Sequence, residues 1–158
     1  MAKIELKNVA HSYSPDVENP EYALKKCNLS WKDGGRYAVL GPSGCGKTTM
    51  LNIMSGLVTP SEGTIKFDGV DITNMSTAER NIAQVFQFPV IYNTMTVAQN
   101  LGFPLLCRNY PKEVITKKVD QVAQTLGLEN LLNLRATKLT ADQKQLISLG
   151  RGLVREDV

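Results

Sequence analysis

Short apolar stretches at a spacing of two residues dominate the first half of the chain, and they predict β-strands. Ile4 and Leu6 alternate with polar residues, and loops rich in glycine, proline or acidic residues separate the stretches that follow. The strands expected on this basis cover residues 4–9, 22–31, 37–40, 64–72 (as a hairpin) and 82–86.

Helical spacing of apolar residues marks four other segments. Met50, Met54 and Leu57 predict a helix over residues 47–57, with one apolar stripe that packs on the sheet. Pro111 suits a helix start and Gly127 a helix end, which delimits a helix over residues 112–126. The remaining helices are expected over residues 96–101 and 140–155. Strands come first and helices later, so we expect an α/β fold.

A glycine-rich loop lies between a predicted strand and a predicted helix, and it fits the pattern G-x-x-x-x-G-K-[ST]. Glycines let backbone N–H groups surround a phosphate, and the N-terminus of the following helix favours an anion. Lys47 is expected to bridge the β- and γ-phosphates of ATP, and Thr48 to give its hydroxyl to Mg²⁺. The loop residues expected to bind the nucleotide are Gly41, Ser43, Gly44, Cys45, Gly46, Lys47, Thr48 and Thr49.

Composition adds little to this prediction. The 158 residues are 42% hydrophobic and carry a net charge of +3 without any block of like charge, so nucleic acid is not an expected partner. The N-terminus lacks the apolar region of a secretory signal, and no apolar run reaches the roughly 18 residues of a membrane span. Cys27, Cys45 and Cys107 lack metal-ligand spacing and are expected to be reduced thiols of an intracellular protein.

The whole chain resembles the ATPase subunits of ABC transporters, and within that group the bacterial sugar and polyol importers. The segments that carry the resemblance are GPSGCGKTT, GLVTPSEGTIKFDGVDIT, RNIAQVFQFPVIYNTMTVAQNL and LTADQKQLISLGRGLVRE. The resemblance implies a P-loop NTPase core over residues 36–58 and 80–88, an antiparallel β subdomain over 1–35 and 63–75, and a helical subdomain over 89–155. It also implies that the chain ends before the Walker B strand, the catalytic base and the switch histidine.

Further site residues are implied by the resemblance. Gln87 matches the Q-loop glutamine, which reaches Mg²⁺ and the attacking water, and with Lys47 it is expected to take part in catalysis. Tyr13 lies where the family places an aromatic ring that stacks on adenine. The alternative for Gln87 is a polar residue at a strand end, and for Tyr13 an aromatic residue packed on the core.

The signature segment departs from the Leu-Ser-Gly-Gly-Gln of the family. Here Thr140, Ala141, Asp142 and Gln143 occupy the positions that face a nucleotide on a second ATPase subunit. Thr140 and Gln143 also form the pattern of a capping box. A carboxylate about 5 Å from a phosphate oxygen repels it by roughly 3 kcal/mol at an effective dielectric constant near 20. Unless Asp142 turns away to cap its own helix, that half-site works poorly, and we hypothesise pairing with a different ATPase subunit.

The function implied by the resemblance is ATP-driven import of a sugar or polyol, and the LTADQK variant resembles glycerol-type importers. Partners would be membrane permease subunits, with residues 88–105 beside their docking groove, and the location the cytoplasmic face of the membrane. The alternative is a truncated module that binds ATP weakly without hydrolysing it, as we expect of this chain alone. An ABC ATPase of DNA repair is disfavoured, because no coiled-coil insertion follows Gln87. The sequence does not name the solute.

Overall fold

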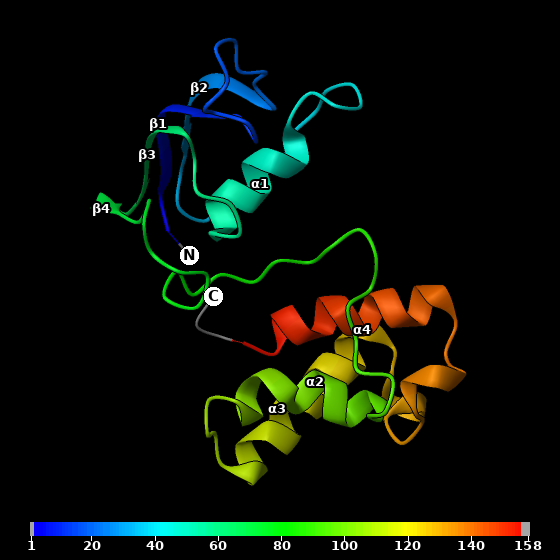
Figure 1. The fold of residues 1–158 in the computed structure, drawn as a ribbon. Helices are drawn as coiled ribbons and strands as arrows, with labels where there is room; N and C mark the ends of the chain where they lie inside the picture. The colour runs from blue at the N-terminus through cyan, green and yellow to red at the C-terminus, as the bar shows by residue number, and fades with distance from the viewer. Residues whose placement is uncertain (1, 156–158) are drawn as a thin grey trace. The chain divides into compact units, whose positions relative to one another are not determined.

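Two compact units make up the chain, with the boundary between Ile82 and Ala83. The structure is a computed structural model that describes residues 2–155. Figure 1 shows a β-sheet in the first unit and a group of helices in the second.

The frame of the first unit is an antiparallel sheet with the strand order β2-β1-β3-β4. Its strands are β1 (Ile4–His11), β2 (Leu24–Trp31), β3 (Glu62–Phe67) and β4 (Val70–Asp71). The central strand β1 pairs with both β2 and β3. β3 and β4 confirm the hairpin expected over residues 64–72.

A bulge in β1 brings both Leu6 and Val9 into the core. The two residues are three positions apart, so a regular strand would place them on opposite faces, yet both are buried. The register shifts between them, and Asn8 has a positive φ of 51°. On the neighbouring strand Gly63 has a φ of 84°, and a Cβ there would lie 2.4 Å from the Asn8 carbonyl oxygen. Only glycine fits beside this bulge.

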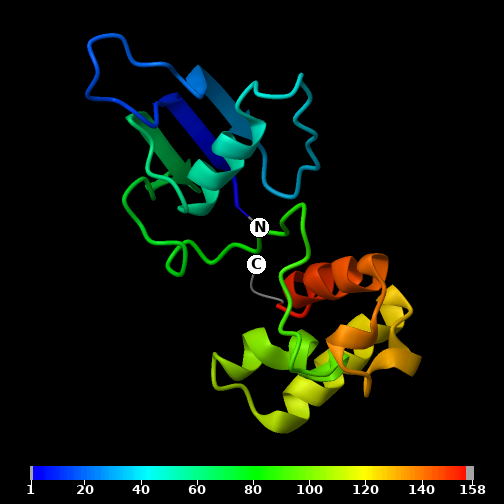
Figure 2. The ribbon, with the colours of Figure 1, turned by 45° about the vertical axis from the view of Figure 1, so that its right-hand side comes forward.

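Helix α1 (Lys47–Ser55) covers one face of the sheet (Figure 2). A helix of nine residues is too short to be stable alone, so its packing on the sheet must hold it. Each apolar side chain that is fully buried between helix and sheet contributes about 1.5–3 kcal/mol to the stability of the fold. The shared core consists of Leu6, Val9, Leu24, Met50, Ile53, Met54, Ile65 and Ile72.

The C-terminal end of α1 is closed by a buried arginine. Arg80 is only 6% exposed, and its guanidinium donates to the carbonyl oxygens of Ile53 at 2.6 Å and Met54 at 3.0 Å. It also donates to the carbonyls of Thr73 and Met75, both at 2.9 Å. Burial lowers the pKa of Arg80. The side chain therefore ties the end of α1 to the segment that follows the β3–β4 hairpin.

The second unit is built from the helices α2 (Val97–Leu106), α3 (Lys112–Leu126) and α4 (Ala141–Leu153). Two short 3-10 helices, Glu129–Leu131 and Ala136–Lys138, lie between α3 and α4. The core of this unit consists of Val97, Leu101, Leu105, Val119, Ala123, Leu128, Ala136, Leu139, Ile147 and Val154. Among the described residues no helix is long and apolar enough to cross a membrane.

Glycine has a packing role in α2 that the sequence pattern did not indicate. We expected this helix to end at residue 101, but it continues to Leu106 through Gly102 and Pro104. A Cβ on Gly102 would lie 2.8 Å from Cγ2 of Ile115, and one on Gly150 would lie 2.5 Å from Cδ2 of Leu101. These glycines allow α3 and α4 to approach α2 closely.

Two predicted strands are wrong. Residues 37–40 and 82–86 are described by the structure and have no regular secondary structure. A strand needs a neighbouring strand for its backbone N–H and C=O groups, and the described sheet β2-β1-β3-β4 includes neither stretch. Leu40 is 89% exposed, and Tyr37 instead stacks on Trp31 with ring centroids 5.2 Å apart. The glycine-rich loop thus leads into the expected helix but does not follow a strand.

We expect Arg80→Ala to lower the free energy of unfolding of the first unit by about 2–4 kcal/mol, because the backbone carbonyl groups that accept from the buried guanidinium lose their donor. Trp31, the single tryptophan, reports on this unit in a urea titration followed by fluorescence. The control is Arg36→Ala, which removes an exposed arginine of the same unit. Equal, small effects of both substitutions would contradict a structural role for Arg80.

Candidate functional site

Positive φ angles shape the glycine-rich loop before α1. Gly44 has a φ of 80° and Gly46, the N-cap residue of α1, has a φ of 89°. A Cβ on Gly46 would lie 2.5 Å from the carbonyl oxygen of Ala23, so a larger residue does not fit. No side chain among the described residues caps this helix N-terminus. Its first backbone N–H groups therefore keep their capacity to bind an anion.

The Lys47 side chain folds back over this loop. Its ammonium group donates to the carbonyl oxygens of Gly41 at 2.8 Å and Pro42 at 2.7 Å, and it lies 3.7 Å from Sγ of Cys45. The positive charge of Lys47 is thus held among neutral acceptors at the N-terminal end of α1. Ser43, Gly44 and Cys45 are exposed around it, and so is Thr48 in the first turn of α1.

Tyr13 lies beside the helix that begins at this loop. It follows the end of β1, and its hydroxyl is 3.4 Å from Oγ1 of Thr49, which is buried. The ring is 64% exposed and contacts His11 edge to face, with centroids 4.6 Å apart and an interplanar angle of 89°. An exposed aromatic ring is therefore brought next to the predicted phosphate-binding residues, although 36 positions separate Tyr13 from Thr49.

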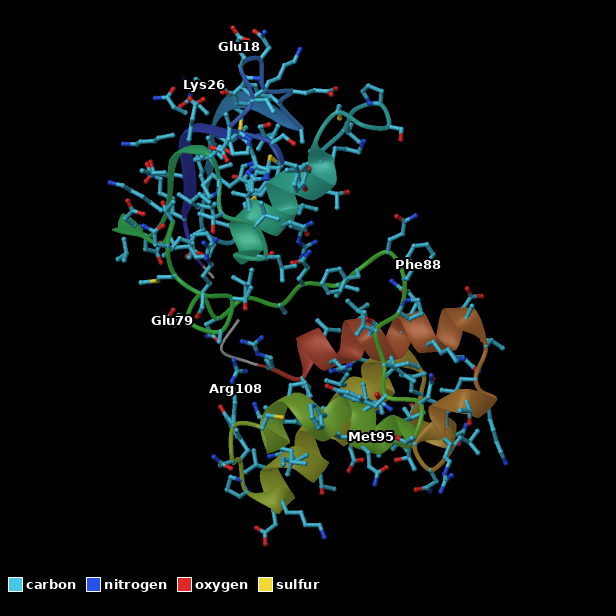
Figure 3. All side chains as sticks on the ribbon, viewed as in Figure 1. Glu18, Lys26, Glu79, Phe88, Met95 and Arg108 are labelled. Carbon is cyan, nitrogen blue, oxygen red and sulfur yellow. The ribbon has the colours of Figure 1, made fainter. Side chains whose placement is uncertain are left out.

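Gln87 belongs to the second unit, in an irregular segment whose backbone is tied to α4. The Gln145 side chain donates to the carbonyl oxygen of Phe86 at 3.1 Å, and Arg151 donates to that of Val90 at 2.6 Å. Gln87 itself is exposed, and the neighbouring Phe88 is 77% exposed (Figure 3). These bonds fix the two ends of the segment on α4 and leave the Gln87 amide at the surface.

The segment at residues 140–143 forms the predicted capping box at the start of α4. The Thr140 hydroxyl accepts from the Gln143 backbone N–H at 3.3 Å, and the Gln143 side chain accepts from the Thr140 N–H at 3.0 Å. Thr140, and not Asp142, is the side-chain cap. Ala141 and Asp142 are exposed in the first helical turn, where a carboxylate is favoured by the helix dipole.

Comparison with known proteins decides the family. The model of the family described as ABC transporter matches residues 24–157, which is most of the chain. The chain belongs to the ABC transporter family. This confirms the resemblance drawn from its motifs.

Relatives within the ABC transporter family include import proteins. The chain is 38% identical over 156 residues to the sn-glycerol-3-phosphate import ATP-binding protein UgpC of Brucella abortus (strain 2308), covering 99% of this chain and 43% of that protein. It is 40% identical over 155 residues to the trehalose import ATP-binding protein SugC of Mycobacterium tuberculosis (strain ATCC 25618 / H37Rv). This match covers 98% of the present chain and 38% of SugC. The chain thus spans less than half the length of these curated relatives.

Solved structures agree with this assignment. The ATP-binding cassette MJ0796, in a dimeric post-hydrolysis state bound to ADP and Pi, matches with a TM-score of 0.84 and 30% identity, covering 96% of this chain and 69% of that one. This confirms the predicted fold class of an ABC ATPase with an antiparallel β part and a helical part. The roles of individual residues stay predictions.

Several residues that hold the segments of the predicted site residues within each unit were not anticipated from the sequence. His11 and Ser61 hold the end of β1, and Arg80 closes α1. Asn100 is fully buried in α2, and its side chain bonds to the backbone of Tyr92 and Thr96. For Asn100 a signal existed, because a polar residue lies on the apolar face that carries Val97 and Leu101. No comparable pattern marks the other three.

A charged network lies next to Ser61 at the start of β3. Glu62 accepts from the Tyr22 hydroxyl at 2.6 Å and forms an ion pair at 2.8 Å with Lys26, whose side chain stands on β2 in Figure 3. The hydrogen bond from Lys26 and then that from Tyr22 lower the pKa of Glu62. The same contacts with Glu62 raise the pKa of Lys26 and of Tyr22.

Because the folded-state pKa of Glu62 is lowered, its contribution to stability is present above the unfolded value of 4.5 and is lost as the pH falls through the lower folded value. We expect Glu62→Gln to lower the urea midpoint at pH 7 slightly, since the network is exposed. This difference from the unsubstituted chain should shrink below pH 4.5. A difference that is independent of pH would show that the charge of Glu62 plays no part.

Proposed function

We propose that the protein is the ATP-binding subunit of an importer for a sugar or polyol, in which nucleotide binding and hydrolysis drive transport through membrane permease subunits. The observation that carries the proposal is the loop before α1, where Lys47 and an uncapped helix N-terminus converge beside an exposed tyrosine. The import proteins named above, at 38% and 40% identity, favour sugar or polyol uptake over other ABC functions.

The loop suits the triphosphate of ATP. Glycines leave backbone N–H groups accessible at the start of α1, and the helix dipole favours negative charge there. Lys47 would exchange the neutral carbonyls of Gly41 and Pro42 for phosphate oxygens, because hydrogen bonds between charged groups are stronger. Tyr13 would stack on the adenine, and Thr49 would contact the α-phosphate.

Hydrolysis would also need Mg²⁺ and Gln87 of the second unit. The exposed hydroxyl of Thr48 and the exposed amide of Gln87 are oxygen donors of the kind Mg²⁺ prefers. When bound, the ion neutralises charge on the β- and γ-phosphates. Gln87 would also orient the attacking water, and Lys47 would stabilise the charge that develops on the transferred phosphoryl group.

The proposed permease contact is the exposed apolar surface beside Gln87. Phe88 is 77% exposed, and Val90 and Tyr92 are 55% and 40% exposed. Arg151 of α4 lies 4.8 Å from the centre of the Tyr92 ring and donates to the Val90 carbonyl, which gives this surface a fixed base. A contact here would place the protein at the cytoplasmic face of the membrane. It would also join the membrane partner to the segment that carries Gln87.

We expect the chain to bind ATP, with affinity reduced at least tenfold by Lys47→Ala, because bonds from a charged donor to phosphate are worth about 1.5–3 kcal/mol. Isothermal titration calorimetry of both proteins measures this. Lys25→Ala, which removes an exposed lysine of β2, serves as the control and should leave the affinity unchanged. Equal ATP affinity in the Lys47→Ala protein would overturn the proposed site.

Pairing with a second, different ATPase subunit is proposed from Asp142. Its carboxylate would face the nucleotide of the partner subunit from the first turn of α4. In membranes that hold the assembled transporter, we expect Asp142→Gly to raise ATPase activity severalfold through loss of repulsion. Asp142→Asn, which removes the charge but keeps the size, should do the same. Unchanged activity in both variants would mean that the aspartate does not impair the half-site.

A further inference from the structure

The exposed ring of Tyr13 packs against a buried side chain, His11. The two rings meet edge to face at a centroid distance of 4.6 Å, and the Tyr13 hydroxyl makes a longer approach of 3.4 Å to Oγ1 of Thr49. His11 is 8% exposed at the end of β1. The histidine is therefore a buried support that can fix the orientation of the tyrosine ring.

Ser61 holds the His11 ring in turn. Its Oγ lies 3.3 Å from Nδ1 of His11, accepts from the Ser12 N–H at 3.1 Å, and lies 3.3 Å from the Ser12 carbonyl oxygen. Ser12 is 2% exposed, and its own hydroxyl accepts from the Ser14 N–H at 3.2 Å. These bonds lock the backbone on both sides of Tyr13 as well as the imidazole beneath it.

A histidine at this position lowers the stability of the fold if its role is only to fill space. Nε2 of His11 is buried and has no hydrogen-bond partner among the described residues. An unsatisfied buried nitrogen destabilises a fold, and an apolar side chain of similar size would avoid that loss. What the imidazole supplies that leucine would not is a flat ring with a fixed angle against Tyr13.

We propose that His11 is a positioning residue, which holds the Tyr13 ring in one orientation so that the ring is ready to stack on a purine base. The inference rests on the proposed function, in which Tyr13 contacts adenine. An exposed tyrosine without this support loses conformational freedom when a base binds, and that loss weakens affinity. The effect falls mainly on ligands that carry a base, because His11 contacts the exposed Tyr13 ring directly, whereas the Tyr13 hydroxyl makes only a long 3.4 Å approach to Thr49 of the phosphate site.

The test compares ATP with tripolyphosphate, which has the phosphates but no base, by calorimetry on the chain and its variants. We expect His11→Leu to weaken ATP binding about three- to tenfold and to leave tripolyphosphate binding unchanged. His11→Phe restores a ring under Tyr13 and should bring ATP affinity to within about twofold of the original. In a Tyr13→Ala background, His11→Leu should have no further effect on ATP.

A merely structural role for His11 gives a different result. Equal weakening of ATP and tripolyphosphate, or the same loss of ATP affinity with Tyr13→Ala already present, would overturn the proposal. If His11→Leu does not fold, as judged by Trp31 fluorescence, Ser61→Ala loosens the imidazole without removing it. That variant should weaken ATP binding alone, and unchanged or equally weakened binding of the two ligands would overturn the proposal.

Failure of the proposed function has its own outcome. If Tyr13→Ala leaves ATP affinity unchanged, the adenine contact itself is wrong. If Tyr13→Ala weakens ATP binding but the folded His11→Leu protein does not, the adenine contact stands and the positioning role of His11 fails.

Discussion

The packing of α1 on the antiparallel sheet is the constraint on which the predicted phosphate site depends. A helix of nine residues has little stability of its own, so the buried stripe of Met50, Ile53 and Met54 sets its position. The bulge in β1 contributes directly, because it adds Val9 to the surface that receives the stripe. A change in that surface would alter where the N-terminus of α1 points, and with it the N–H groups predicted to bind a phosphate.

The two ends of α1 differ, because side-chain hydrogen bonds close only the C-terminal end. At the C-terminal end the Arg80 guanidinium satisfies the carbonyls of Ile53 and Met54, and Gly56 ends the helix in the left-handed conformation. At the N-terminal end Gly46 provides no side-chain cap. The fold therefore satisfies the C-terminal end of α1 with its own side chain and leaves the N-terminal end, where the phosphate site is predicted, without a side-chain cap. Lys47 fits this arrangement, because its charge is held by loop carbonyls that a phosphate can replace.

Local patterns predicted those elements that local interactions stabilise. The helix over residues 112–126 was predicted with its observed bounds, because its amphipathic face, Pro111 and Gly127 are all read from neighbouring residues. The capping box of Thr140 and Gln143 is a local feature too. By contrast, residues 37–40 and 82–86 were predicted as strands from their apolar character, but a strand is completed by a partner from elsewhere in the chain. The contacts of Arg80 and His11 join distant segments, so no spacing in the sequence indicated them.

The start of α4 shows a conflict between helix capping and the predicted contact with a nucleotide. Of the four N–H groups that a helix leaves unpaired at this end, the capping box uses those of Thr140 and Gln143. The groups of Ala141 and Asp142 remain for an outside acceptor, and they are the ones that a phosphate would approach. A carboxylate at Asp142 stabilises α4 through the helix dipole, and it repels an anion at the same position for the same electrostatic reason. Helix stability and the proposed contact with a partner's nucleotide would thus set opposite demands on this residue, and the exposed aspartate favours the helix.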